Sequence, residues 1–259
     1  MSFRLEPTFR EVLADADRPL IGMWVSSGSA LVAEIMAGSG IDWLLIDMEH
    51  GPNTLTTLQA QLQAIAAYRV PVVVRVPAND PVVIKQVLDT GAQNVLVPMV
   101  GSAAEAQAAA AAVRYPPEGV RGVGSALARS GRWGRVPGYV QNASAHVSLI
   151  VQIESGDAVD AAGAIAAVDG VDGVLVGPAD LAASLGAPGQ QGHPDVVDAV
   201  HRVFAAVTAA GKRVGVNAFD PAASDAYLAA GAHFVSVSAD VTLLARGSDA
   251  VAARFIPPS

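Results

Sequence analysis

The stretch Trp43-Leu44-Leu45-Ile46-Asp47-Met48 decides the fold class, together with the helical segment Thr54–Ala67 and the run Val72-Val73-Val74-Arg75-Val76 that follow it. Both apolar runs are nearly continuous, which is typical of strands buried on both faces of a parallel sheet. A strand, a helix and a second such strand in this order predict a βαβ unit.

The same alternation continues along the whole chain, where eight short apolar runs are each followed by a helical segment. Several of these segments begin at a residue that favours the N-cap position, namely Ser29, Asp80, Ser102 and Asp220. The predicted strands are Leu20–Val25, Trp43–Met48, Val72–Val76, Val95–Val100, Ser148–Ile153, Gly173–Val176, Arg213–Asn217 and Phe234–Ser238. The predicted helices are Ser29–Ala37, Thr54–Ala67, Pro81–Asp89, Ala103–Val113, Ala158–Ala167, Pro194–Ala209, Pro221–Ala230 and Val241–Ala253.

Eight strand–helix units in 259 residues match the size and order of a (β/α)₈ TIM barrel. The structural competitor is an open doubly wound sheet, but no Gly-x-Gly-x-x-Gly follows the first strand. We see no interdomain linker, so residues 1–259 are expected to form one α/β domain. The long irregular stretch Arg114–His146, between the fourth and fifth strands, is expected to be functional or interfacial.

Composition excludes several classes of function. The chain has no cysteine, which rules out disulfides, thiolate nucleophiles and iron–sulfur clusters. Its net charge of −8 argues against binding to nucleic acid or to an anionic membrane. No apolar run approaches the length of a membrane span, and the acidic N-terminus does not resemble a secretory signal. We therefore expect a soluble, cytoplasmic protein.

Lysine is nearly absent. The two lysines are Lys85, in the third predicted helix, and Lys212, just before the seventh strand. Neither position is at the carboxyl end of a strand, where a (β/α)₈ barrel carries its catalytic groups. The sequence thus disfavours an aldolase that forms an imine on lysine and favours chemistry assisted by a metal ion.

Polar side chains gather at the ends of four predicted strands. Because the carboxyl ends of all strands meet at one rim of a (β/α)₈ barrel, these side chains are expected to form one site. Burying such groups is costly unless they are paired, so stability alone does not explain them. They are Asp47, Glu49 and His50 after the second strand, Arg75 in the third, Gln152 and Glu154 at the fifth, and Asp180 after the sixth.

Each of these residues has a structural interpretation beside the functional one. Glu154 and Asp180, on neighbouring strand ends, suit a hard divalent cation, although each could instead cap a helix. Arg75 suits a carboxylate or an enolate oxygen, or a structural ion pair with Asp47 or Glu49. His50 could be a general base, a metal ligand or a structural residue.

The irregular stretch also reverses the local charge. Five of the 14 arginines lie in residues 114–135, where Glu118 is the one acidic residue. Such a loop could attract an anionic substrate, or it could pair with acidic groups in a subunit interface. The five are Arg114, Arg121, Arg129, Arg132 and Arg135.

Several long motifs resemble the HpcH/HpaI family of metal-dependent (class II) pyruvate aldolases, and the similarity covers nearly the whole chain. The motifs are Asp42-Trp43-Leu44-Leu45-Ile46-Asp47-Met48-Glu49-His50-Gly51-Pro52-Asn53, Lys85-Gln86-Val87-Leu88-Asp89-Thr90-Gly91-Ala92-Gln93, Arg114-Tyr115-Pro116-Pro117-Glu118-Gly119-Val120-Arg121-Gly122, Gln152-Ile153-Glu154-Ser155 and Gly177-Pro178-Ala179-Asp180-Leu181.

The resemblance implies a role for each site residue. Glu154 and Asp180 would bind Mg²⁺ or Mn²⁺, with Co²⁺ or Ni²⁺ as alternatives. Arg75 would contact the keto oxygen of a 2-oxoacid and stabilise its enolate. His50, oriented by Asp89, would form an acid–base dyad. The residues expected around the substrate are Trp24, Gln152, Gly177, Pro178, Ala179, Asn217 and Phe219.

The resemblance also implies an assembly and a reaction. Members of the family are typically hexamers built as dimers of trimers, with the last helix exchanged between subunits. The expected reaction is the reversible cleavage of a 4-hydroxy-2-oxoacid to pyruvate, or hydroxypyruvate, and an aldehyde. Val216-Asn217-Ala218-Phe219 differs from the leucine and small aliphatic residue usual in the family, which leaves the aldehyde open. Rival hypotheses are a citrate-lyase-type lyase acting on an acyl-CoA ester and a non-catalytic barrel that binds a 2-oxoacid.

Overall fold

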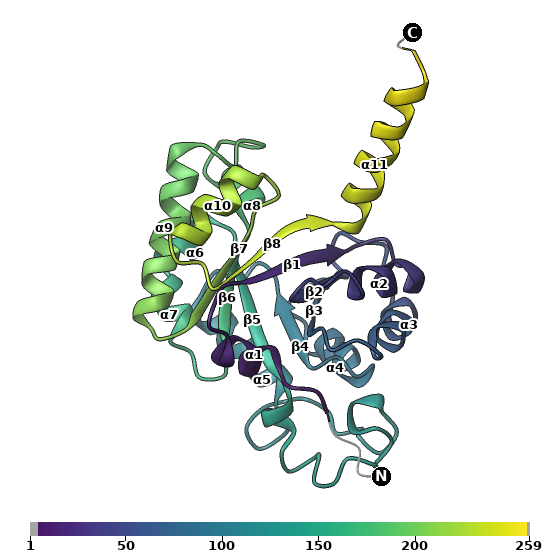
Figure 1. Ribbon diagram of the computed structural model, residues 1–259. Coiled ribbons are helices and arrows are strands. Elements are labelled where there is room, and N and C mark those ends of the chain that lie inside the picture. Colours follow the sequence, from purple (N-terminus) through teal and green to yellow (C-terminus); the bar gives the residue numbers. More distant parts are fainter. Residues whose placement is uncertain (1–4, 258–259) are drawn as a thin grey trace.

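The computed structural model describes residues 5–257 and contains a closed barrel of eight parallel strands. Each strand pairs with the next along the chain, and β1 pairs with β8 to close the barrel (Figure 1). The predicted (β/α)₈ fold is therefore confirmed. The strands are β1 (Leu20–Val25), β2 (Trp43–Asp47), β3 (Val72–Arg75), β4 (Asn94–Val97), β5 (Ser148–Ile153), β6 (Gly173–Val176), β7 (Arg213–Asn217) and β8 (Phe234–Ala239).

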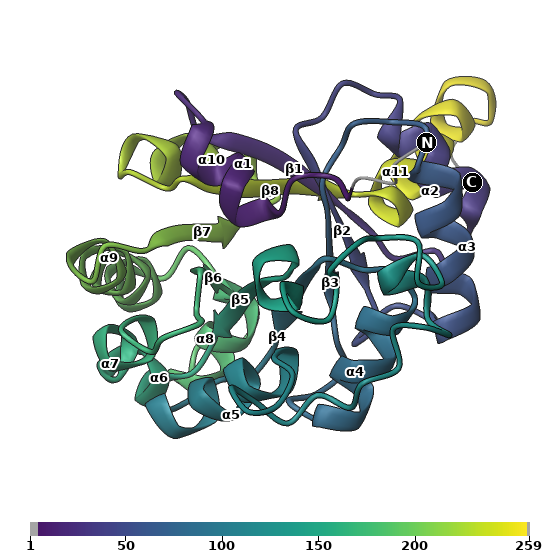
Figure 2. The same ribbon diagram turned by 90° about the horizontal axis from the view of Figure 1, so that it is seen from below.

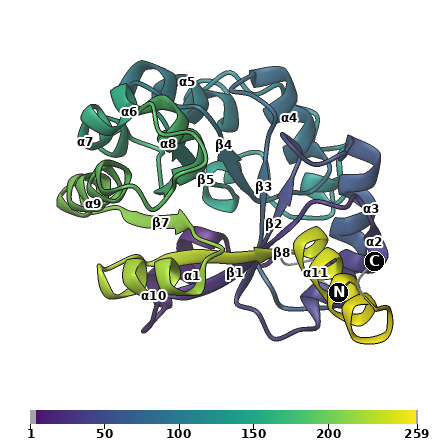
Figure 3. The ribbon, with the colours of Figure 1, turned by 90° about the horizontal axis from the view of Figure 1, so that it is seen from above.

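Helices surround the barrel in chain order, as the views along the barrel in Figures 2 and 3 show. The predicted N-caps are confirmed, since the side chains of Ser29, Asp80, Ser102 and Asp220 each accept a hydrogen bond from a backbone N–H of the following helix. The helices between strands are α2 (Ala30–Ala37), α3 (Leu55–Ile65), α4 (Pro81–Asp89), α5 (Ala103–Val113), α6 (Gly156–Asp160), α7 (Ala162–Ala166), α8 (Pro178–Ser184), α9 (Pro194–Ala209) and α10 (Pro221–Ala229).

Three features differ from the prediction. The strand β4 ends at Val97 and not at Val100, because Pro98 has no N–H and Met99 adopts a left-handed φ of 55°. The helix predicted over Ala158–Ala167 is two short helices, which meet at Ala161. Two helices were not predicted, α8 and α1 (Phe9–Asp15), although Thr8 and Glu11 form a capping box that signals the start of α1.

The hydrophobic core within residues 5–257 has two large parts, and a small third cluster lies in the stretch 115–143. Of the two large parts, the larger lies between the strands and the surrounding helices, and the smaller fills the barrel itself. At the amino end of the barrel three rings pack together, with centroids 5.3 Å apart for Phe9 and Trp43 and 5.4 Å apart for Phe9 and Phe234. Helix α1 thus closes this end, which leaves the carboxyl end of the strands for the polar residues.

The last helix, α11 (Asp240–Phe255), projects away from the barrel (Figures 1 and 3). Its apolar side chains are exposed, with 71% of Leu244, 61% of Val251 and 73% of Phe255 accessible to solvent. The exchange of this helix between subunits stays a prediction. None of the helices in the described part of the chain combines the length and the apolar character that a membrane span requires.

Two glycines make room for the aromatic rings inside the barrel. A Cβ atom on Gly22 would lie 2.2 Å from the Trp43 ring, and one on Gly215 would lie 2.4 Å from the Phe234 ring. Contacts this short force a shift of a ring or of the strand itself. Small residues at these two positions are therefore a condition for closing the barrel.

We predict that Gly215→Ala lowers the free energy of unfolding by about 2–3 kcal/mol, because the added methyl group overpacks the barrel interior. Urea unfolding of the variant and the parent measures this difference. The matched control is Gly192→Ala, where nothing lies within 4 Å of the added atom. Equal losses in the two variants would contradict the proposed packing role.

Candidate active site

The centre of the candidate site is Arg75, the last residue of β3. Its side chain is almost fully buried, and it forms a fork with Asp47 in which Nε and Nη2 donate to Oδ1 and Oδ2 at 2.9 and 2.8 Å. Its Nη1 atom also lies 2.8 Å from Oε2 of Glu49. The interpretation of Arg75 as a member of an ion pair is confirmed, and both acidic residues take part.

Local strand geometry explains this pairing. Asp47 and Arg75 are direct partners in the register of β2 and β3, so both side chains emerge at the same height of the barrel. The Asp47 carboxylate also accepts a hydrogen bond from the backbone N–H of Glu49 at 3.0 Å, which orders the loop after β2. On the other side, the guanidinium carbon of Arg75 lies 4.3 Å from the centroid of the Trp24 ring. Arg75 is therefore held on three sides.

Two carboxylates lie near this arginine. Glu154, directly after β5, is almost fully buried, and its Oε1 atom accepts a hydrogen bond of 2.7 Å from the backbone N–H of Met99. Its Oε2 atom accepts a hydrogen bond from Nε2 of Gln152. Burial, followed by the nearby charges of Asp180 and Glu49, raises the pKa of Glu154 to about 7.

Neither carboxylate caps a helix. The N-cap of α6 is Ser155, and the N-cap position of α8 is Gly177, which leaves Asp180 within the first turn of α8. Burial is also the main cause of a raised pKa of Glu49, to which the charges of Asp47 and Asp180 contribute. The site therefore concentrates negative charge that Arg75 offsets only in part.

The residues present fit a hard divalent cation. Carboxylate and amide oxygens are the donors such an ion prefers, and Oε1 of Gln152 is buried without a hydrogen-bond partner. No group of three His, Cys, Asp or Glu residues within residues 5–257 could hold a metal ion. A cation on Glu154 and Asp180 would therefore take its remaining ligands from substrate or water.

A cavity of about 350 Å³ opens at the rim of the barrel and brings most of the predicted site residues together. Glycine at position 177 leaves room in its wall, since a Cβ atom there would lie 2.7 Å from Nε2 of Gln152 and 2.8 Å from Oε2 of Glu154 and would displace these side chains. Pro178 lines a neighbouring cavity of about 310 Å³ that shares two residues with the first. The predicted residues that line the first cavity are Trp24, His50, Arg75, Gln152, Gly177, Ala179, Asp180, Asn217 and Phe219.

The sequence did not single out Ser236 and Asp240 on the β8 side of the rim. The Asp240 carboxylate accepts hydrogen bonds from the backbone N–H groups of Ser26 and Ser27 at 2.8 and 3.0 Å, which fixes the loop after β1. Asp240 could have been found from the sequence, because it is a polar residue directly after a barrel strand. Ser236 lies within β8 and gave no such signal.

One predicted contact is not made within a single chain. His50 follows β2 at the carboxyl rim, where its side chain is 68% exposed and Nε2 lies 4.0 Å from Oε2 of Glu49. Asp89 ends α4, which returns the chain to the amino end of the barrel, and its Oδ1 atom lies 3.3 Å from Nη2 of Arg121. The two members of the predicted dyad are thus at opposite ends of the same barrel.

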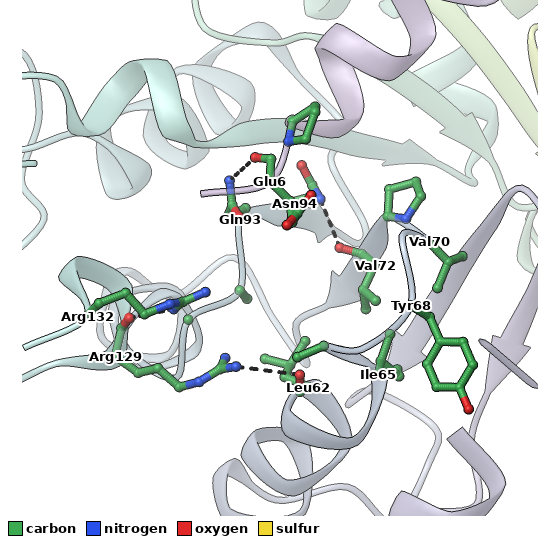
Figure 4. Close-up of a pocket in the computed structure, with 15 residues that line it drawn as sticks. Glu6, Leu62, Ile65, Tyr68, Val70, Val72, Gln93, Asn94, Arg129 and Arg132 are labelled. Atoms are coloured by element: carbon green, nitrogen blue, oxygen red, sulfur yellow. Dashed lines mark hydrogen bonds between the residues drawn. The ribbon is translucent and has the colours of Figure 1, made fainter. Parts of the chain in front are cut away.

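The arginine-rich stretch also lies at the amino end, since it connects the end of α5 to the start of β5. Arg114 pairs with Asp169 at 2.7 Å, while Arg129 donates to the carbonyl oxygen of Thr90 at 3.0 Å. Figure 4 shows Arg129 and Arg132 at a pocket there. The pKa of each of these two arginines is lowered, and burial is the main cause in both. For Arg129, the nearby charge of Arg132 lowers the pKa further. Within one chain this stretch does not reach the rim cavity.

Comparison with known proteins identifies the family. The family model described as HpcH/HpaI aldolase/citrate lyase matches residues 20–247. The chain belongs to this family. It is thus an aldolase-type carbon–carbon lyase, and the family resemblance noted in its motifs is confirmed.

Individual relatives support the same assignment. A protein of Salmonella dublin named 4-hydroxy-2-oxo-heptane-1,7-dioate aldolase is 50% identical over 251 residues, which cover 97% of this chain and 95% of that protein. An HpcH/HpaI aldolase/citrate lyase family protein from Burkholderia cenocepacia J2315 is 44% identical with a TM-score of 0.91, over 96% of this chain and 98% of that one. An HpcH/HpaI aldolase from Desulfitobacterium hafniense DCB-2 is 29% identical with a TM-score of 0.87, over 98% of both chains.

We predict that Asp47→Ala lowers the free energy of unfolding by about 3–5 kcal/mol, because it leaves the buried charge of Arg75 without its main partner. Chemical denaturation measures the loss. The matched control is Arg18→Ala, which breaks the exposed pair of Arg18 with Asp42 and should leave stability nearly unchanged. A loss no larger than that of the control would show that the buried fork does not hold the rim together.

Proposed function

We propose that this aldolase catalyses the reversible cleavage of a 4-hydroxy-2-oxoacid to pyruvate, or hydroxypyruvate, and an aldehyde. The observation that carries the proposal is the pair of carboxylates Glu154 and Asp180 beside an arginine that is held rigidly at the same rim. Positive charge held at a fixed place is what the enolate of a 2-oxoacid requires.

Glu154 and Asp180 would hold a divalent cation, Mg²⁺ or Mn²⁺, with Co²⁺ or Ni²⁺ as alternatives. When bound, the cation supplies a positive charge that stabilises the developing negative charge on the keto oxygen of the substrate. Gln152, whose Oε1 atom is buried and unpaired, and the backbone at Gly177–Ala179 would help to hold the 2-oxoacid.

Arg75 supplies the second positive charge. A guanidinium has five N–H donors, and two of them donate to Asp47, while Nη1 lies 2.8 Å from Oε2 of Glu49 in an ion pair without a hydrogen bond. The remaining donors on Nη1 and Nη2 would be available to the keto oxygen of a substrate in the cavity that Arg75 lines. Because the fork with Asp47 fixes the guanidinium plane, the direction of these donors is set before the substrate binds.

His50 is the residue at the rim suited to moving a proton near neutral pH. In the cleavage direction it would accept the proton of the 4-hydroxyl group, so that the C3–C4 bond breaks and the aldehyde leaves. The electron pair of that bond passes to C3 and the keto oxygen as an enolate, and protonation at C3 then completes the 2-oxoacid. Addition of the enolate to an aldehyde is the same sequence in reverse.

The proposed dyad of His50 and Asp89 requires two subunits, since one chain holds these residues at opposite ends. An assembly is also supported by the exposed apolar side chains of α11, which are unusual for a helix in contact with water. We therefore propose a homo-oligomer, a hexamer arranged as a dimer of trimers, in which α11 packs on a neighbouring subunit and Asp89 reaches a neighbour's His50.

Removal of divalent cations with a chelator should abolish the lyase activity, and Mg²⁺ or Mn²⁺ should restore it. Glu154→Gln should also weaken Mn²⁺ binding, measured by calorimetry without substrate, by about tenfold or more, because affinity for hard cations depends on ligand charge. Asp169→Asn, at an exposed carboxylate, is the matched control. Full activity without a metal ion, or turnover confined to a CoA thioester, would refute the proposal.

Mixed oligomers test the shared dyad. His50→Ala and Asp89→Ala should each be nearly inactive alone, whereas co-expressed subunits should regain about a quarter of the parent activity, because sites with both native residues form at random across interfaces. Co-expression of His50→Ala with Arg75→Ala is the control. Both of these residues belong to the same chain's site, so no site in this mixture has both native residues and activity should not recover. An absence of recovery in both mixtures would show that Asp89 does not act on a neighbour's His50.

A further inference from the structure

The side chain of Asn217, the last residue of β7, is fixed in one orientation by two hydrogen bonds to its oxygen. Nε1 of Trp24 donates to Oδ1 at 3.1 Å, and the hydroxyl group of Ser236 donates to the same atom at 2.7 Å. Trp24 also donates to the Ser236 oxygen at 2.6 Å, which closes a three-membered network. Since an indole N–H can only donate, the atom of Asn217 that faces it must be the oxygen.

The amide nitrogen of Asn217 is left as a free donor. Its Nδ2 atom donates to no group in residues 5–257, and it is not among the buried atoms without a partner. Asn217 lines the rim cavity together with Arg75 and Asp180. Asn217 also lines the neighbouring cavity of about 310 Å³, so its side chain lies where the two cavities meet.

Trp24 connects this donor to the proposed enolate site. Its ring lies 4.3 Å from the guanidinium carbon of Arg75, and it is only 6% exposed. One rigid side chain thus touches both the residue proposed to hold the keto oxygen and the amide of Asn217. The apolar side chains of the cavity wall include Phe219 and Val241, and its hydroxyl-bearing side chains are those of Ser26 and Thr242.

We infer that Asn217 selects the aldehyde, because its Nδ2 atom donates a hydrogen bond to an oxygen on the aldehyde chain. This inference rests on the proposed aldolase function. The preferred electrophile is accordingly an aldehyde that carries an acceptor oxygen, such as a hydroxyl or carboxylate group, and not an alkyl aldehyde of the same size. A donor that is desolvated without a partner disfavours the alkyl aldehyde.

The test compares glycolaldehyde with propanal, which differ by a hydroxyl group in place of a methyl group. With pyruvate as nucleophile, kcat/KM of the parent enzyme should favour glycolaldehyde by about tenfold or more after correction for hydration of each aldehyde. Asn217→Leu should bring the ratio of the two close to one. Phe219→Leu is the matched control, because it alters the wall without altering its donors, and it should keep the preference.

A second variant separates loss of the donor from loss of the fold. Asn217→Asp keeps an acceptor for Trp24 and Ser236 but replaces the N–H₂ group by an oxygen. The test substrates are methoxyacetaldehyde, whose ether oxygen can only accept a hydrogen bond, and butanal, which has a methylene group in its place. This variant should react more slowly with methoxyacetaldehyde than with butanal. Equal kcat/KM for paired aldehydes in the parent, or a preference that survives in both Asn217 variants, would overturn the inference. Exchange of pyruvate methyl protons in D₂O by the parent reports on the proposed function alone, since it needs no aldehyde.

Discussion

The buried fork between Asp47 and Arg75 is the interaction on which the rest of the site depends. It joins the last residues of two paired strands, so its geometry is set by the barrel and not by a loop. A buried ion pair contributes little net stability, because desolvation offsets most of the attraction. Its value here is orientation. The fork fixes a guanidinium plane against Trp24, and Trp24 in turn fixes the amide of Asn217 on the far side of the cavity.

The rim carries more carboxyl groups than positive charges, which suits the binding of a divalent cation. Glu49, Asp47, Glu154 and Asp180 bring four carboxyl groups near one guanidinium, and burial with mutual repulsion raises the pKa of Glu154 to about 7. A divalent cation would relieve that repulsion. Neither lysine adds positive charge at the rim, because Lys212 donates to the carbonyl oxygen of Val171 beside the start of β7 and Lys85 lies on α4.

Much of the fold and of the rim could be predicted from the sequence, because a parallel barrel converts chain order into position. Arg75 ends β3, Gln152 lies one residue before the end of β5, and Asp180 lies in the first turn of α8 after β6, and strand ends meet at one rim whatever the side chains are. The N-caps could also be predicted, because capping depends only on residues that are close together in the chain. The split of the helix at Ala161 was not predicted, because no Pro or capping side chain marks it in the sequence.

Other features depend on contacts that no local pattern encodes. The orientation of Asn217 on β7 requires Ser236, its register partner on β8, and Trp24 on the next strand, β1. The position of Asp89 relative to His50 follows from the direction of α4, and the family motifs gave the pair without its geometry. The apolar side chains of α11 are exposed in the single chain, and it was the family resemblance, not a local pattern, that predicted a neighbouring subunit for this helix.

In the proposed reaction the rim residues Arg75, Glu154 and Asp180 stabilise the enolate of a 2-oxoacid without a lysine. The decisive experiment is proton exchange at the methyl group of pyruvate, followed by NMR in D₂O, in a variant that carries both Lys85→Arg and Lys212→Arg. Exchange should continue at close to the parent rate and should stop when divalent cations are removed. Loss of exchange in the folded double variant, or exchange that persists without a divalent cation, would show that the enolate is stabilised in another way.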